Sequence, residues 1–207
     1  VLLGLGVPYE AVAILKNYVR SLWAANEELN LISRKMTREE LIDNHLIDCL
    51  LPLKHFPAGV EAVADFGSGG GLPGVVYAIL FPRIRFHLFE KSPRKQEFLR
   101  RCREWAPNLE IHGEIPRSLQ AVDSGIGVVM ARAFKPIDVI FDMSREYLSK
   151  GGRYFLLKGR HEKIEEEILV ARKKFRIDGN PPFVITPLAS PVLDVERHLV
   201  SVGRMSV

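Results

Sequence analysis

Two helical stripes of apolar residues occupy the first part of the chain. Between Tyr9 and Glu28, apolar side chains recur at intervals of three and four residues, which is the period of one helix face. A second stripe follows Thr37-Arg-Glu-Glu40, whose spacing is typical of a capping box at a helix amino terminus. Pro52 and the turn at 56–59 are expected to end this helix. Residues 1–58 are therefore predicted to form a helical extension.

From residue 60 onward, short β-prone runs alternate with helical segments. The predicted strands cover residues 60–64, 84–90, 109–112, 127–131 and 153–158. The predicted helices between and after them cover residues 75–81, 93–105, 136–148 and 162–175. Such alternation predicts an α/β fold with a mainly parallel sheet and helices on both faces. We expect residues 59–207 to form this domain, packed with the extension as one globular unit.

The end of the chain departs from this alternation. Phe183–Thr186 and His198–Val202 are β-prone, and only a short connection that contains Leu193–Glu196 separates them. Because no helix lies between the two runs, they are expected to pair as an antiparallel hairpin at the sheet edge. The complete prediction is a Rossmann-like sheet of seven strands that ends in this hairpin.

Composition adds few constraints. The 207 residues are 47% hydrophobic and 26% charged, which is ordinary for a globular protein. The net charge of +4 is compatible with a nucleic-acid partner but too small to establish one. Cys49 and Cys102 lack the paired spacing of a zinc site, so no metal is expected.

No apolar run approaches the length of about 20 residues that crosses a bilayer. The first residues also lack the basic leader and the small-residue cleavage site of a signal peptide. We therefore expect a cytoplasmic protein without a membrane partner.

The glycine-rich stretch Asp65-Phe-Gly-Ser-Gly-Gly-Gly-Leu-Pro-Gly74 lies between the first predicted strand and a helix. Such a turn brings backbone close to a nucleotide-like ligand in α/β folds. A P-loop would need Lys and Ser or Thr after its last glycine, whereas Leu72, Pro73 and Val75 occupy this region. The dinucleotide spacing of Gly69, Gly71 and Gly74 is weak evidence, and a turn without a ligand is a further alternative.

Two carboxylates favour one ligand over the others. Asp65 lies at the mouth of the turn, where it would repel a pyrophosphate but attract the ammonium group of a methionine tail. Glu90 ends the second predicted strand, where an acid accepts hydrogen bonds from both ribose hydroxyls. Together with the terminal hairpin, these positions favour S-adenosylmethionine and the class I methyltransferase fold.

Several short motifs resemble one family of methyltransferases more closely. They are Asn30-Leu31, His45-Leu-Ile-Asp48, the glycine-rich stretch with its Leu-Pro-Gly74 ending, Arg132-Ala-Phe134, Leu157-Lys-Gly159 and Glu196-Arg-His-Leu199. Together they span most of the chain. They resemble the family of 16S ribosomal RNA guanine-N7 methyltransferases, also called glucose-inhibited division protein B or ribosomal RNA small subunit methyltransferase G.

The resemblance implies roles for individual residues in the pocket. Gly67 and Leu72 would line the cofactor site, Glu90 would bind the ribose, and Ile115 and Pro116 would lie beside the adenine. Arg132 would lie at the end of the fourth strand, near both the methionine and the incoming base. The expected cofactor-binding residues are Asp65, Gly67, Ser68, Gly69, Gly71, Leu72, Glu90, Ile115, Pro116 and Arg132.

Two segments depart from the family pattern. Glu114-Ile-Pro116 replaces the usual arginine, small apolar residue and glutamate, so the contacts with adenine are expected to differ. The linker after Asn30 is one residue longer, which leaves Arg34 and Lys35 as alternative matches for a family arginine.

Guanine N7 carries a lone pair and has no proton to lose at neutral pH. Methyl transfer to this atom therefore needs neither a general base nor a metal, and alignment with exclusion of water is sufficient. The residues expected at the substrate side are Arg132, Asn30, His45, Lys158 and Arg197. For three of these a structural role is the alternative: a buried hydrogen bond for His45, a turn cap for Asn30, and cover of the sheet edge for Arg197.

Two further features have a competing interpretation. Asn180-Pro-Pro-Phe183 resembles a motif of exocyclic amino-group methyltransferases, but it follows the wrong strand, and a rigid turn is the favoured interpretation. A basic helix could bind phosphate or simply be solvated. Its residues are Arg94, Lys95, Arg100, Arg101 and Arg103.

The sequence thus predicts an S-adenosylmethionine-dependent enzyme that methylates guanine N7 of 16S rRNA in the small ribosomal subunit. A methyltransferase for a small molecule or a protein is one alternative, and a non-catalytic nucleotide-binding module is another. The oligomeric state does not follow from the sequence, although a monomer is favoured.

Overall fold

The structure is a computed structural model that describes residues 1–33, 35–179 and 181–203. Within these residues, seven strands form one sheet in the order β3-β2-β1-β4-β5-β7-β6. The strands are β1 (Ala62–Phe66), β2 (Arg85–Phe89), β3 (Leu109–His112), β4 (Ile126–Arg132), β5 (Tyr154–Lys158), β6 (Phe183–Pro187) and β7 (His198–Val202). Strands β1 to β5 are parallel, and β7 runs antiparallel to both β5 and β6. The predicted sheet and its terminal hairpin are confirmed.

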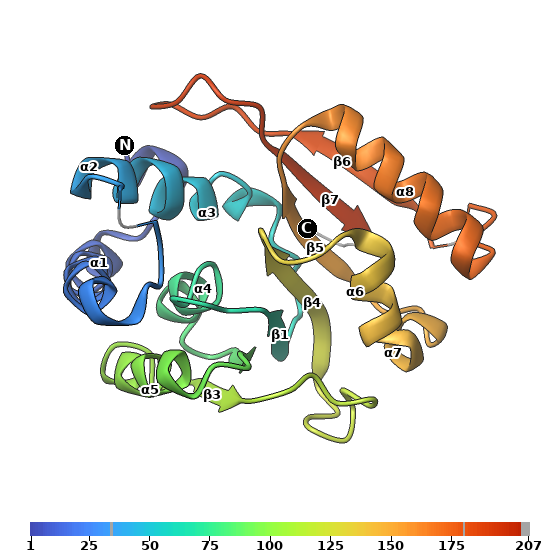
Figure 1. The fold of residues 1–207 in the computed structure, drawn as a ribbon, viewed down its shortest axis with the longest axis horizontal. Coiled ribbons are helices and arrows are strands. Elements are labelled where there is room, and N and C mark those ends of the chain that lie inside the picture. The colour runs from blue at the N-terminus through green and yellow to red at the C-terminus, as the bar shows by residue number, and fades with distance from the viewer. Residues whose placement is uncertain (34, 180, 204–207) are drawn as a thin grey trace.

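Helices cover both faces of this sheet (Figure 1). The side with α1, α4 and α5 holds one core cluster, and the side with α6, α7 and α8 holds the other. The bounds are α1 (Tyr9–Leu29), α2 (Arg38–Leu41), α3 (Asp48–Leu50), α4 (Gly74–Leu80), α5 (Pro93–Arg101), α6 (Ile137–Met143), α7 (Arg145–Ser149) and α8 (His161–Phe175). Short 3₁₀ turns occur at Leu3–Leu5, Leu53–His55 and Cys102–Glu104.

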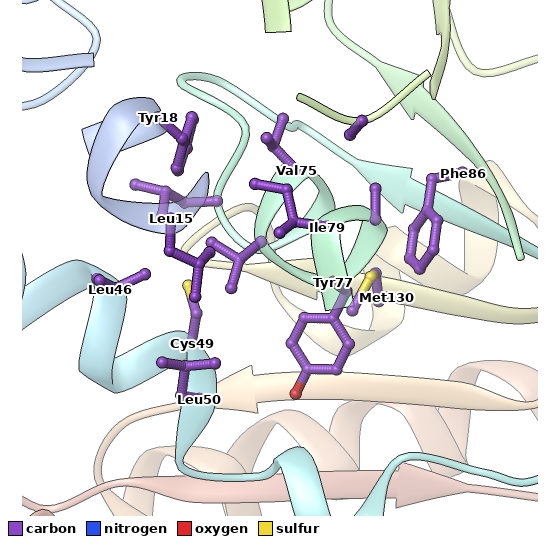
Figure 2. Close-up of a cluster of buried hydrophobic side chains, with 14 of the residues drawn as sticks. Leu15, Tyr18, Leu46, Cys49, Leu50, Val75, Tyr77, Ile79, Phe86 and Met130 are labelled. Atoms are coloured by element: carbon purple, nitrogen blue, oxygen red, sulfur yellow. The ribbon is translucent and has the colours of Figure 1, made fainter. Parts of the chain in front are cut away.

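The helical extension packs directly on the sheet domain. Figure 2 shows Leu15 and Tyr18 of α1 and Leu46, Cys49 and Leu50 from the second helical region facing side chains of α4. All of these extension residues belong to the core cluster that also includes Val75–Ile79 of α4 and Phe86 and Leu88 of β2. The extension and the sheet domain therefore share one hydrophobic core, because each would expose an apolar face without the other.

The second helical region is not the single α-helix that its apolar stripe predicts. Its capping box is present, because Glu40 N donates to Thr37 Oγ1 and Thr37 N donates to the Glu40 carboxylate. After α2, however, Ile42–Ile47 forms a π-helical segment before α3 begins. A π-turn widens the helix, and such turns are frequent at functional sites.

The predicted helix over 136–148 is likewise divided into α6 and α7. Ser144 lies between the two helices with φ −125° and ψ 35°. Its hydroxyl bonds the carbonyl of Ile140 and the hydroxyl of Tyr154, so the side chain competes with the regular helix pattern.

Among the described residues, no helix has both the length and the apolar character that crossing a membrane requires.

Candidate functional site

The glycine-rich loop follows β1 and folds back over the end of β2. Gly67, Gly69 and Gly71 have φ angles of 71°, 56° and 92°, which residues with a side chain adopt only at a cost. The amides of Gly67 and Ser68 both donate to the carbonyl of Phe89, at 2.9 and 3.2 Å. The glycines therefore allow the sharp turn that holds this backbone beside the carboxyl end of β2.

Glu90 fixes the same loop from the next strand. Its Oε2 accepts a hydrogen bond from Gly69 N at 3.0 Å, and its Oε1 accepts one from Ser92 N at 2.8 Å. Because each carboxylate oxygen can accept about two hydrogen bonds, both retain capacity for a ligand hydroxyl. This residue can therefore order the loop and bind a ribose at the same time.

A cavity of about 590 Å³ opens beside the loop and Glu90, and we call it the larger cavity. Its volume lies within the range of small-molecule sites. Of the predicted cofactor residues, it brings together Gly67, Ser68, Gly69, Leu72, Glu90, Ile115 and Arg132. Gly71 and Pro116 are not among its lining residues, and a side chain at Gly71 would meet Val75 and Tyr18 behind the loop.

Asp65 does not lie where the sequence analysis expects it. Its side chain is 1% exposed and is not among the residues that line the larger cavity. Successive strand residues point to opposite faces, so Asp65 lies with Val63 on the α4 side of β1. A Cβ atom added to Gly74 of α4 would come within 2.5 Å of Asp65 Oδ2, so the carboxylate packs against this helix. Burial raises the pKa of this carboxyl group to about 7, although the nearby Ser68 side chain and Gly74 backbone favour its charged form. This placement does not support direct contact with a ligand ammonium.

Arg132 lies at the carboxyl end of β4 and joins residues that are distant in the sequence. Its Nη1 donates to Asp48 Oδ2 at 3.0 Å, and its Nη2 lies 2.9 Å from His45 Nδ1. Asp48 Oδ1 in turn accepts a hydrogen bond from Arg197 Nε at 2.6 Å. One carboxylate therefore holds two arginines, and Arg132 is only 12% exposed.

His45 is held in its neutral form within this cluster. Burial, followed by the charge of Arg132, lowers its pKa to about 4. A neutral ring can accept the Arg132 hydrogen bond at Nδ1, which places the proton on Nε2. This Nε2 is buried without a partner among the described residues, and His45 lines the larger cavity. His45 therefore fixes Arg132 from within the wall of the larger cavity.

A smaller cavity of about 340 Å³ adjoins the first one. The two cavities share the segment Arg132–Lys135 as a common wall. The charged groups of the smaller cavity are Arg132, Lys135, Lys158 and Arg197 together with Asp48 and Glu167. Cations therefore outnumber acids, which suits an electronegative or anionic ligand.

The Lys158 ammonium is held by two hydrogen bonds. Its ammonium donates to Glu167 Oε2 at 2.7 Å and to the carbonyl of Lys135 at 2.8 Å. The same Glu167 oxygen accepts a bond from Ile137 N at 3.1 Å, at the start of α6. Lys158 thus lines the smaller cavity as expected and also fixes the loop that follows Arg132.

Asn30 lies apart from both cavities among the described residues. It ends α1 with φ 51°, and its amide donates to the carbonyl of Asn26, so its observed role is the turn cap. Of the two alternative matches in the linker, Lys35 is exposed, and Arg34 lies outside the described residues. Lys35 lines neither of the two cavities.

Pro181 and Pro182 of the Asn180-Pro-Pro-Phe183 motif lie near the amino-terminal ends of the parallel strands. Asn180 is outside the described residues, whereas Pro181 and Pro182 share a surface pocket with Gly127 and Gly152. Gly127 and Gly152 are at or before the amino ends of β4 and β5, opposite the glycine-rich loop. The interpretation as a turn that opens β6 agrees with this position.

Sequence reasoning missed three contributors to the site. Phe134 packs on the loop so closely that a Cβ at Gly67 would lie 2.1 Å from its ring. The Tyr18 hydroxyl of α1 donates to the carbonyl of Gly70 at 2.7 Å. Asp48 belongs to the motif His45-Leu-Ile-Asp48 but is not among the expected site residues, although its three-residue spacing from His45 on one helical region allows both to face Arg132.

Solved structures share this architecture. The fold is similar to that of an O-methyltransferase from Bacillus cereus in complex with SAH, with a TM-score of 0.56, 13% identity and 91% coverage of each chain. A precorrin-6y C5,15-methyltransferase from Geobacter metallireducens aligns with a TM-score of 0.54 and 12% identity over 84% of this chain and 92% of that one. These similarities confirm the predicted methyltransferase fold.

Curated relatives are more similar in sequence. Ribosomal RNA small subunit methyltransferase G 1 of Bdellovibrio bacteriovorus is 62% identical over 200 residues, which cover 97% of this chain and 94% of the relative. Ribosomal RNA small subunit methyltransferase G of Pelagibacter ubique is 31% identical over 79% of each chain. In addition, residues 11–200 match the family model described as GidB, rRNA small subunit methyltransferase G.

These matches confirm the resemblance inferred from the motifs, the prediction of a methyltransferase and the prediction of S-adenosylmethionine as its methyl donor. The two cavities around Arg132 are thus the candidate active site of a methyl-transfer enzyme. The chain belongs to the family of rRNA small subunit methyltransferase G.

Proposed function

We propose that this protein transfers a methyl group from S-adenosylmethionine to N7 of a guanine in 16S rRNA of the small ribosomal subunit. The observation that carries the proposal is the junction at Arg132, where a loop-lined cavity meets a second cavity rich in cations. The first suits a nucleoside cofactor, and the second suits an electron-rich base edge with its phosphate.

In the larger cavity, the residues present fit the cofactor. Glu90 retains acceptor capacity for ribose hydroxyls, and Ile115 offers an apolar contact for adenine. Backbone at Gly67, Ser68 and Gly69 supplies close approach without side-chain obstruction. Leu72 and Arg132 complete the wall, whereas Gly71 supports the turn from behind.

On the substrate side, Arg132 is the residue best placed to meet the base. Arginine commonly donates to guanine O6 and N7, although N7 must be free of such a bond when it attacks. We therefore assign Arg132 to O6 or to a neighbouring phosphate, with Asp48 and His45 holding the guanidinium in place. Arg197 and Lys158 would act at the phosphate, while Asn30 acts only by ending α1.

The proposed mechanism needs positioning rather than proton transfer. Bound S-adenosylmethionine supplies a methyl group on a sulfonium, which is a good leaving group. The chain contributes a fixed approach line, because the segment Arg132–Lys135 borders both cavities and Asp48 holds Arg132 in place. Neutral His45 holds the Arg132 guanidinium through Nδ1 and does not serve as a base.

Three wider features belong to the same proposal. Residues 1–58 would act as a helical extension of a methyltransferase domain formed by 59–207, and the protein would work as a monomer in the cytoplasm.

The basic helix would contact rRNA phosphate through its exposed arginines, which are Arg94, Arg100, Arg101 and Arg103. RNA binding should then weaken steeply with added salt, and a flat salt response would remove this helix from the interface.

The test is a map of the methylated position. Small ribosomal subunits that lack the modification are incubated with the protein and isotope-labelled S-adenosylmethionine, and the labelled nucleotide is identified by mass spectrometry. We expect one guanine of 16S rRNA to gain the methyl group at N7. Label on a small molecule or protein, or cofactor binding without any transfer, would favour the two alternatives, and preferential binding of NAD would contradict the cofactor.

A further inference from the structure

Three potential metal ligands face one another at the far side of the sheet from α5. His87 of β2 is paired in register with Glu110 of β3, and Phe89 is paired with His112. Residues at alternate positions of paired strands point to the same face, so His87, Glu110 and His112 project together. His87 is 1% exposed, whereas the Glu110 side chain is 52% exposed.

The spacing of their ligand atoms suits a small divalent ion. His87 Nδ1 lies 3.1 Å from His112 Nε2 and 3.5 Å from a Glu110 oxygen. Tetrahedral ligands at the usual 2.0–2.1 Å from Zn²⁺ are separated by about 3.3 Å. All three ligand atoms lie within 4.8 Å of one another, and the exposed Glu110 side chain is free to close the remaining distance.

A carboxylate behind the ring, Asp123, prepares His87 to be a ligand. Its Nε2 lies 2.9 Å from Asp123 Oδ2, and Asp123 also binds Arg85 Nε at 2.6 Å and Gly125 N at 2.8 Å. A carboxylate that is paired with arginine accepts hydrogen bonds, so the His87 proton resides on Nε2. The Nδ1 lone pair then faces His112 and Glu110, as in the carboxylate–histidine–zinc arrangement.

We propose that His87, His112 and Glu110 form a binding site for a divalent transition-metal ion of the Zn²⁺ type, with Asp123 orienting His87. Two imidazoles and one carboxylate are a common ligand set for Zn²⁺, and they leave a fourth position for water. The half-exposed side of the cluster provides the path by which the ion and this water enter. The sequence gives no sign of the site because its ligands come from two separate strands.

The role of this site is structural rather than catalytic. None of its three ligands lines the larger cavity, and the proposed methyl transfer requires no metal. The strands that carry the ligands lead directly to Glu90 and to Gly113, which do line it, and Glu90 N donates to the carbonyl of His112 at 3.1 Å. A bound ion would therefore tie β2 to β3 next to the part of the larger cavity that Glu90 and Gly113 line.

The experiment uses the untagged full chain after treatment with a chelator. Zn²⁺ is titrated by calorimetry, and Co²⁺ serves as a spectroscopic probe of tetrahedral geometry. We expect one ion per chain and a rise in melting temperature when Zn²⁺ is present. Glu110→Gln and His112→Gln should each weaken Zn²⁺ binding by at least about 10-fold, and Asp123→Asn by about 10- to 100-fold.

The matched control is His161→Gln. His161 also lies beside a carboxylate, Glu165 at 3.9 Å, but it belongs to none of the three-residue clusters found among the described residues. This variant should bind Zn²⁺ like the unmodified protein. Absence of one-to-one binding, or unchanged affinity in either Glu110→Gln or His112→Gln with a native circular dichroism spectrum, would overturn the assignment. Because Glu110 is exposed, its variant should fold even if the His112 variant does not.

Discussion

The two cavities meet at Arg132 but are built from different chemical groups. The larger cavity relies on backbone, because a loop of glycines lies against Phe89 and Glu90. The smaller cavity relies on charged side chains that neutralise one another, such as Asp48 between Arg132 and Arg197. A site built from backbone recognises the shape and the hydroxyl groups of a ligand. In a site built from ion pairs, a charged side chain can leave its partner within the protein and bind a charged group of the ligand instead.

This difference also explains what the sequence could reveal. Closely spaced glycines before a helix, with an acid at the end of the next strand, are local signals, and they placed the loop and Glu90 correctly. The Arg132 cluster joins residues from the extension, β4 and the terminal hairpin, so no local pattern shows that Asp48 lies between two arginines. Motif resemblance identified the arginines but not their shared partner.

The misplacement of Asp65 has a simple physical cause. Its position before the first glycine suggested a place at the cavity mouth, but strand alternation already places it on the same face as Val63, toward α4. The π-helical segment at Ile42–Ile47 is a different case, because its apolar stripe also fits an ordinary α-helix. The sheet, in contrast, followed from its alternating elements.

The largest effect is expected at the residue that both cavities share. Arg132→Ala removes a buried cation from Asp48 and His45, so methyl transfer to small subunits should fall by about 100-fold or more. The free energy of unfolding should fall by about 3 kcal/mol, which is the lower end of the usual loss when a buried ion pair is broken. We expect the lower end because Arg197 still neutralises Asp48. Initial-rate assays and urea unfolding measure the two quantities.

The matched control for this variant is Arg145→Ala. Arg145 forms an ion pair with Asp142 but is 69% exposed, so its loss should change stability by no more than about 1 kcal/mol. Equal effects of the two substitutions would mean that burial of the Arg132 pair is unimportant. Near-normal methyl transfer by Arg132→Ala would remove this residue from the proposed mechanism.

The next effect separates the larger cavity from the smaller one. Glu90→Gln replaces a carboxylate that accepts two backbone hydrogen bonds, so affinity for S-adenosylhomocysteine should fall by about 10- to 100-fold. Glu114→Gln is the control, because Glu114 is exposed, forms a surface ion pair with Lys91 and is not among the residues that line the larger cavity. Calorimetry compares the two, and an equal loss of affinity would contradict a specific role for Glu90.

Two buried groups should give pH effects of opposite sign. Burial raises the pKa of Asp65 to about 7, so this residue lowers stability progressively as pH rises from about 4 to about 7. Burial and the charge of Arg132 lower the pKa of His45 to about 4, so this residue raises stability as pH rises from about 4 to about 6.5. The two contributions should largely cancel in the unmodified protein.

Single substitutions should reveal each contribution. Asp65→Asn should make stability rise with pH over this window, and His45→Gln should make it fall, each by about 2 kcal/mol after allowance for solvent screening. Urea unfolding at several pH values measures the slopes, with the exposed Asp194→Asn as a control. Parallel curves for all four proteins would contradict the buried positions of both groups.

The smallest effect concerns the contact between α1 and the glycine-rich loop. Tyr18→Phe removes the 2.7 Å hydrogen bond to the carbonyl of Gly70, so stability should fall by about 1 kcal/mol. Affinity for S-adenosylhomocysteine should weaken by less than about 10-fold, because the loop keeps its bonds to Phe89 and Glu90. Tyr9→Phe, at a residue that is 82% exposed, should change neither quantity.

Arg197 lines the smaller of the two cavities and not the larger one. Its substitution therefore tests whether the larger cavity binds the cofactor and the smaller one binds the RNA. Binding of S-adenosylhomocysteine and methyl transfer to small ribosomal subunits are measured on the same preparation of Arg197→Ala. We expect cofactor affinity within about twofold of the unmodified protein and methyl transfer at least about 10-fold slower. Loss of cofactor affinity, or methyl transfer at the normal rate, would contradict separate roles for the two cavities.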